Sequence, residues 1–268
     1  MNFAWSKKFK LLLALFALTA LGRSSLSAQT DLSAAQIIQN AVARAQNPAT
    51  KPASGAYTYT KLTLTEEFDS TGKMKEHKEK VYQVNFRNGA TYAKLVEVNG
   101  HAPAAADLKK QAENESNAQQ MTGSRSNKAE NRENFLTPEI VERFDFILVG
   151  RTNFNGRATY QVAFQPKNPA PPGHHMIDRL LDRISGEVLI DAQEFEIARA
   201  ELHLGSEVNL LGGVIGSLKK LVYTMTCTRL DDGLWLKTSS FGDFEGRKLI
   251  DAMRIKTSSR AINFRPLL

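Results

Sequence analysis

The residues best suited to chemistry lie together in one short segment, where two adjacent histidines precede two aspartates. If this segment is helical, His174, Asp178 and Asp182 share one face, and with His175 they could hold a hard or borderline metal ion. No third histidine is near, and the Pro-Pro-Gly that precedes the pair is typical of a loop. We therefore interpret the segment as a polar connection between strands and predict neither a metal site nor a cofactor. A metal-assisted hydrolase using His174, His175 and Asp178 remains the weakest of three functional hypotheses.

The single cysteine, Cys227, alternates with large apolar residues. A reactive thiol needs a cationic, exposed setting, so this pattern indicates a buried hydrophobic residue. One cysteine also excludes an internal disulfide and is typical of an exported bacterial protein rather than a disulfide-rich module.

The glycines at 212, 213 and 216 lack the spacing of a phosphate-binding loop. The apolar residues around them allow two interpretations. The segment is either a loop packed against the protein, or a flap that covers an apolar cavity or contacts a membrane surface. Acidic pairs such as Glu66/Glu67 and Asp231/Asp232 lie at strand ends and turns, which turn chemistry explains. No nucleophile elbow, zinc-protease motif or Cys-His signature occurs, so we predict no catalytic residue and no enzyme.

The first 28 residues have the pattern of a secretory signal peptide. Three lysines precede an apolar run at 11–21 that is too short to span a bilayer comfortably, and small residues follow. This segment carries four positive and no negative charges, so its removal lowers the formal net charge from +7 to +3. The basic composition is therefore weak support for a nucleic-acid partner, and we predict none. We expect residues 29–268 to form a single β-rich domain in the periplasm.

Residues 31–46 predict a helix with one apolar face, because Ala34, Ile37, Ile38 and Ala41 recur at helical spacing. Ser33 and Gln36 have the spacing of a capping box at its start. From residue 57 the apolar period changes to two, with Asn-Gly pairs at 88–89, 99–100 and 155–156 as hairpin turns. Residues 102–133 break this pattern and predict an exposed helix followed by a mobile loop.

The segment Ile184–Leu204 predicts two strands joined by an acidic turn. The apolar parity changes near 193–197, so we expect a bulge or turn there. The charged residues Asp191, Glu194, Arg199 and Glu201 are interpreted as the solvated outer side. Without βαβ alternation, the whole chain predicts a mainly β (α+β) fold with about nine to eleven antiparallel strands.

Three segments carry a resemblance to a known family: FDFILVGRTNFNGRATYQVAFQPK at 144–167, RISGEVLIDAQEFEIARAELHL at 183–204 and LDDGLWLKTSS at 230–240. Together with the export signal and the amphipathic helix, they resemble the LolA/LolB-like outer-membrane lipoprotein-sorting superfamily over roughly residues 144–264. The resemblance implies a strongly curved sheet or unclosed β-barrel, covered by the N-terminal helix and short helical connections. It also implies a non-enzymatic carrier of lipid or lipoprotein acyl chains, with transient membrane contact.

The first functional hypothesis is therefore a periplasmic protein that binds acyl chains by apolar burial. Its cavity candidates are the residues of apolar parity on the predicted strands, with one tryptophan near the rim: Tyr160, Val162, Phe164, Val188, Ile190, Leu202, Leu204, Tyr223 and Trp235. Plain core packing is the alternative for each of them. The second hypothesis is a cell-envelope interaction or scaffold domain, with a protein partner at strand edges or at the 102–133 insertion.

Overall fold

The computed structural model describes residues 32–46, 57–87, 90–121, 136–173, 176–210, 216–248 and 251–267. Residues 33–268 form one compact unit, and the fold below is that of this unit. The predicted signal peptide, the His174–His175 pair, the 88–89 turn and the apolar loop at 211–215 lie outside the described residues.

Strands dominate this unit, and every pairing between them is antiparallel, as predicted. The strands are β1 (Tyr57–Phe68), β2 (Met74–Arg87), β3 (Ala90–Val98), β4 (Phe144–Phe154), β5 (Arg157–Pro166), β6 (Ile184–Asp191), β7 (Ile197–Leu204), β8 (Val208–Leu210), β9 (Gly216–Arg229), β10 (Trp235–Lys248) and β11 (Asp251–Pro266). The helices are α2 (Ala34–Gln46), α3 (Ala105–Met121), α4 (Pro138–Val141) and α5 (Met176–Leu181). Among the described residues, no helix is both long and apolar enough to cross a membrane.

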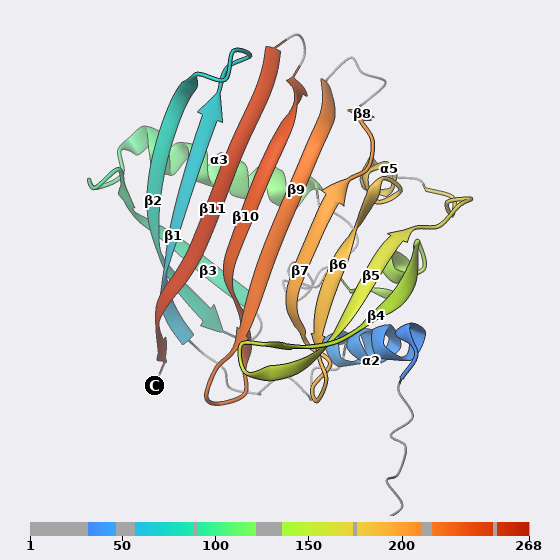
Figure 1. Cartoon of the computed structure of the whole chain (residues 1–268). Coiled ribbons are helices and arrows are strands. Elements are labelled where there is room, and N and C mark those ends of the chain that lie inside the picture. The colour runs from blue at the N-terminus through green and yellow to red at the C-terminus, as the bar shows by residue number, and fades with distance from the viewer. Residues whose placement is uncertain are drawn as a thin grey trace, which may run out of the picture. The chain divides into compact units, whose positions relative to one another are not determined.

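One 11-stranded sheet has the order β3-β2-β1-β11-β10-β9-β7-β6-β5-β4, with β8 paired to β9. The end strands β3 and β4 do not pair with each other, so the curved sheet stays open. Figure 1 shows α3 crossing behind β2, β1 and β11 in this view. The N-terminal helix α2 contacts β4.

Several local predictions are confirmed. In the capping box, the Ser33 N–H donates to Gln36 Oε1 at 2.9 Å, and the Gln36 N–H donates to Ser33 Oγ at 3.3 Å. Asn99-Gly100 and Asn155-Gly156 have positive φ at both residues, the requirement of a tight hairpin turn. The parity change in the 184–204 segment is a turn at 192–194 together with a register shift between Leu189 and Ile190.

Register assigns each strand residue to one of two faces, because directly paired residues point to the same side. Lys78 Nζ lies 2.8 Å from Asp107 Oδ1 on α3, so the side chains that share the parity of Lys78 face this helix. We call this side of the sheet the α3 face and the other side the opposite face.

Gly186 lets two strands approach closely on the α3 face. A Cβ at this position would lie 2.0 Å from the backbone oxygen of Glu201 on the neighbouring strand. Only glycine fits there, because no backbone atom can give way by that amount. Gly242 interrupts the same cross-strand row, and the ring of Phe244 packs over it.

Candidate functional site

The α3 face is apolar over β5, β6, β7 and β9. Two cross-strand rows show this, and both follow from the pairing of neighbouring strands. The first row is Val162, Val188, Ala200 and Met225; the second is Phe164, Gly186, Leu202 and Tyr223. The structure therefore brings the predicted cavity residues of four strands onto one surface.

Burial divides these predicted residues into two groups. Val162 and Ile190 are 0 % exposed, and Tyr160 and Val188 are also buried, so these four pack within the core. Four others keep part of their surface accessible: Phe164, Leu202, Leu204 and Tyr223. The ninth, Trp235, is also half-buried, but its Nε1 donates to Glu194. The half-buried group is the part of the face that an apolar ligand can reach.

The same rows become polar and then cationic on the other half of the sheet. Beyond Met225, the first row continues through Ser240, Ser259 and Thr63 to Lys80. Beyond Tyr223, the second continues through Gly242, Thr257 and Thr65 to Lys78. The α3 face thus has an apolar half and a hydroxyl-rich half that ends in lysines, an arrangement that suits an amphiphile.

A hollow of about 550 Å³ lies on the opposite face, over β1, β2, β10 and β11. Leu62, Leu64, Val81 and Phe241 give it an apolar lining, and Arg260 borders it. Its volume lies within the range of small-molecule sites. Leu62 is 38 % and Phe241 42 % exposed, so this second apolar surface is open to solvent. None of the predicted cavity residues lines it.

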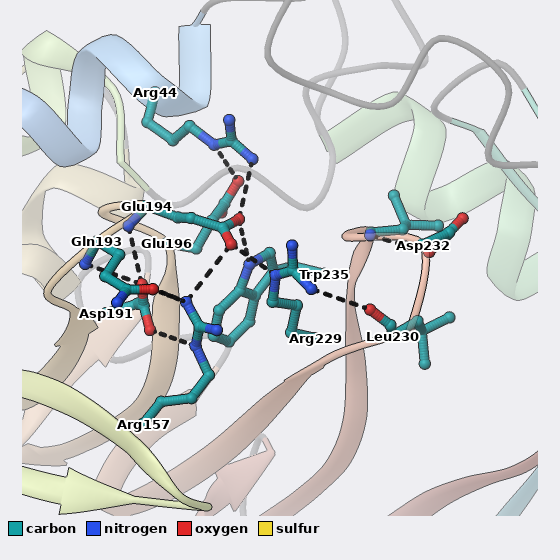
Figure 2. A network of polar contacts seen from close by, with 11 residues as sticks. Arg44, Arg157, Asp191, Gln193, Glu194, Glu196, Arg229, Leu230, Asp232 and Trp235 are labelled. Atoms are coloured by element: carbon teal, nitrogen blue, oxygen red, sulfur yellow. Dashed lines mark hydrogen bonds and ion pairs between the residues drawn. The ribbon is translucent and has the colours of Figure 1, made fainter.

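A network of charged side chains joins the β6–β7 turn to the starts of β5 and β10 (Figure 2). Asp191 is 0 % exposed and accepts hydrogen bonds from Arg157 Nε at 2.6 Å and from Arg157 Nη2 at 2.9 Å. It also accepts from the backbone N–H groups of Gln193 and Glu194. Burial by itself raises the pKa of Asp191, but these hydrogen bonds outweigh it and hold the pKa below its usual range.

Glu194 connects this pair to α2 and to the β9–β10 turn. Its Oε1 lies 2.5 Å from Arg229 Nε, and its Oε2 accepts from Trp235 Nε1 at 3.0 Å. Arg44 of α2 lies 3.7 Å from Glu194 and donates to Glu196 at 2.8 Å. Three arginines therefore face three carboxylates, and the formal charges cancel. Such a balanced, hydrogen-bonded network stabilises the turns at this end of the strands and leaves no excess charge for an ionic ligand.

The interpretation of Asp191 and Glu194 as solvated outer residues is therefore wrong, because both are engaged in this network. Strand alternation predicts which face of the sheet a side chain points to, but not whether that face is open to solvent at the residue. At Asp191, Arg157 and the backbone of the turn enclose the carboxylate. Arg199 and Glu201 do pair on an accessible part of the opposite face, beside a polar groove. Sequence reasoning missed Arg44, Arg157 and Arg229 because their partners are up to 152 residues away.

The structure also shows the surroundings of two other candidates from the sequence, Asp182 and Cys227. Asp182 pairs with the buried Arg143 at 2.6 Å, so it is engaged in an ion pair. Within the described part of the chain, no three metal-ligating side chains cluster. Cys227 is half-buried in β9, more accessible than predicted.

Comparisons with known proteins find only distant structural similarities. The sequence matches no family model and no curated protein. A domain from Vibrio parahaemolyticus, described as an outer membrane lipoprotein-sorting protein, aligns with 85 % of this chain and 90 % of its own, at 11 % identity and a TM-score of 0.37. A LolA superfamily protein from Nitrosomonas europaea aligns over 89 % and 95 %, at 8 % identity and a TM-score of 0.32. A DUF1329 family protein from Desulfovibrio piger aligns over 88 % and 94 %, at 12 % identity and a TM-score of 0.33.

Two of these structures are described with the name of the family that the sequence resembles. Identities and scores at this level transfer no function, so the functional argument below depends on the chain's own residues.

Proposed function

We propose that this protein is a non-enzymatic binder and carrier of lipid or lipoprotein acyl chains in the periplasm, and that the chain binds on the apolar half of the α3 face. One observation carries the proposal: four neighbouring strands present an apolar surface on which Phe164, Leu202, Leu204 and Tyr223 stay partly accessible. The resemblance found in the sequence implies the same class of cargo.

The energetics suit a flexible hydrocarbon. Each methylene that leaves water for this surface contributes about 0.8 kcal/mol, so a chain that buries half of its methylenes gains several kcal/mol before the entropy of ordering is subtracted. Binding of this kind needs no catalytic group, and it tolerates chains of different length.

Two other surfaces are weaker candidates for the acyl chain. The network around Asp191 and Glu194 is electrically neutral, and its charged groups are hydrogen-bonded to each other. The hollow on the opposite face is apolar, but it lies on the side away from α3. The helix α3 crosses β2, β1 and β11, so it lies beside the apolar half of the same face (Figure 1).

The test is binding of Nile red, an uncharged dye that fluoresces in apolar surroundings, and its displacement by hexadecanol. Leu202→Gln places an amide in the middle of the apolar half, and we expect it to weaken binding at least about tenfold, which corresponds to about 1.4 kcal/mol. Leu62→Gln is the matched control, because the same change is made in the hollow on the opposite face.

The pair of variants separates the two surfaces. Loss of binding with Leu202→Gln, and binding within about twofold with Leu62→Gln, supports the α3 face. The reverse result moves the site to the hollow, and a wild-type protein that binds neither dye nor hexadecanol contradicts the carrier function.

A further inference from the structure

We infer that the lipid bound by this protein carries an acidic headgroup, a carboxylate or a phosphate, and that Lys80 and Thr63 bind it on the α3 face. The inference depends on the proposed function, because it assigns the head of the molecule whose chain lies on the apolar half.

The position of the two residues comes from strand register. Lys80 on β2 pairs directly with Thr63 on β1, so both side chains point to the α3 face. Their cross-strand row continues through Ser259 and Ser240 to Met225, where the apolar half begins. At about 4.8 Å per strand, four strand spacings separate Lys80 from Met225, roughly 19 Å. A chain on the apolar half therefore points one end along this row toward the lysine.

Lys80 is the cation available for an anion. Its neighbour Lys78 is already neutralised, because Lys78 Nζ lies 2.8 Å from Asp107 Oδ1 and 3.9 Å from Glu76. The second oxygen of Asp107 accepts from the Ala104 N–H, so both oxygens are engaged. Lys80 forms no hydrogen bond or ion pair within the described part of the chain. Burial lowers the pKa of Lys80, the charge of Lys78 lowers it further, and the charge of Asp107 offsets only part of this shift, so the pKa stays below its usual value; a bound anion would raise it.

Thr63 supplies a second observation, independent of Lys80. Its hydroxyl oxygen is buried, and it has no hydrogen-bond partner in the described structure. The next hydroxyls in the row, those of Ser259 and Ser240, are 2.8 Å apart and satisfy each other. Because a buried hydroxyl without a partner is unfavourable, an acceptor that binds beside Lys80 would stabilise the hydroxyl of Thr63. A carboxylate or phosphate oxygen accepts from both the hydroxyl and the ammonium group, and such charge-assisted hydrogen bonds are the stronger kind.

The test compares ligands with the same chain and different heads. Hexadecanoate, hexadecyl phosphate and hexadecanol each displace Nile red from the wild-type protein, Lys80→Met and Thr63→Val. Lys80→Met keeps an unbranched apolar side chain and removes the charge. We expect it to weaken both anionic ligands about tenfold to a hundredfold and hexadecanol less than about twofold. Thr63→Val preserves the shape of the side chain, and we expect a smaller loss with the same preference for anionic ligands.

Lys94→Met is the matched control, because Lys94 is exposed and has the parity of the opposite face. Equal effects of Lys80→Met on charged and uncharged ligands, or none on either, would overturn the headgroup assignment while leaving the carrier function intact. No displacement by any ligand would instead contradict the carrier function. Inorganic phosphate is the last arm: if it competes with hexadecyl phosphate at similar concentrations, the site binds free anions and the lipid assignment fails.

Discussion

Replacing Asp191 with alanine tests the buried ion pair between the end of β6 and the start of β5. The change removes the acceptor of two hydrogen bonds from Arg157 and of two backbone N–H groups. Breaking a buried pair by deleting one partner costs about 3–5 kcal/mol, because the other charge stays behind without compensation. For a domain of this size, that loss corresponds to a fall in Tm of about 6–20 °C.

Urea unfolding followed by tryptophan fluorescence measures this loss. The chain has two tryptophans, Trp5 in the predicted signal peptide and Trp235 in the network itself. After removal of the signal peptide, the fluorescence therefore reports directly on the surroundings of Glu194. Asp145→Ala is the control: Asp145 is exposed on β4, and we expect a change within about 0.5 kcal/mol.

The pH dependence of stability gives a second readout of Asp191. The network lowers the pKa of this carboxyl in the folded protein, so its stabilisation is present above the unfolded pKa of about 3.9. It is lost as the pH falls through the lower folded value. The difference between wild type and Asp191→Ala should be constant near neutral pH and should shrink below about pH 4. A difference of less than about 1 kcal/mol at pH 7 would refute the reasoning.

Three further predictions concern stability. Gly186→Ala should destabilise the protein by about 2–3 kcal/mol or more in urea unfolding, because the added Cβ meets a backbone oxygen. Gly150→Ala is the control and should cost less than about 1 kcal/mol, because the space around Gly150 is open. Similar losses for the two variants would contradict the close approach of the strands at Gly186. Arg44→Ala should cost about 1–2 kcal/mol and speed hydrogen exchange of the α2 amides, and unchanged exchange would mean that the ion pairs do not hold the helix. Burial and Asp232 raise the pKa of Tyr57 to about 12, so stability should fall between about pH 10 and 12, and Tyr57→Phe should remove that fall.

Local features of the fold were predictable because nearby residues determine them. The capping box at Ser33 and the tight turn at Asn155-Gly156 each need only a few consecutive residues, and both formed as expected. The alternating pattern of β5 likewise placed Tyr160 and Val162 on one face. An antiparallel sheet followed from the absence of helices between most strands.

The candidate site was predictable only in part, because burial and pairing depend on strand order. Alternation gives the side on which Leu202 points, but it cannot say that Leu202 stays accessible while Val162 becomes core. The pairing of Lys80 with Thr63 requires the register between β1 and β2. Asp191 looked solvated because its arginine partner comes from another strand, 34 residues earlier in the chain.

Paramagnetic broadening by a fatty acid with a nitroxide near its methyl end tests the central claim most directly. In NMR spectra of the protein with 16-doxyl-stearate, we expect the strongest loss of signal at Phe164, Leu202 and Tyr223 on the α3 face. Signals at Leu62 and Phe241, which line the hollow, should remain. Broadening confined to the hollow, or spread evenly over the sheet, would contradict acyl-chain binding on the α3 face.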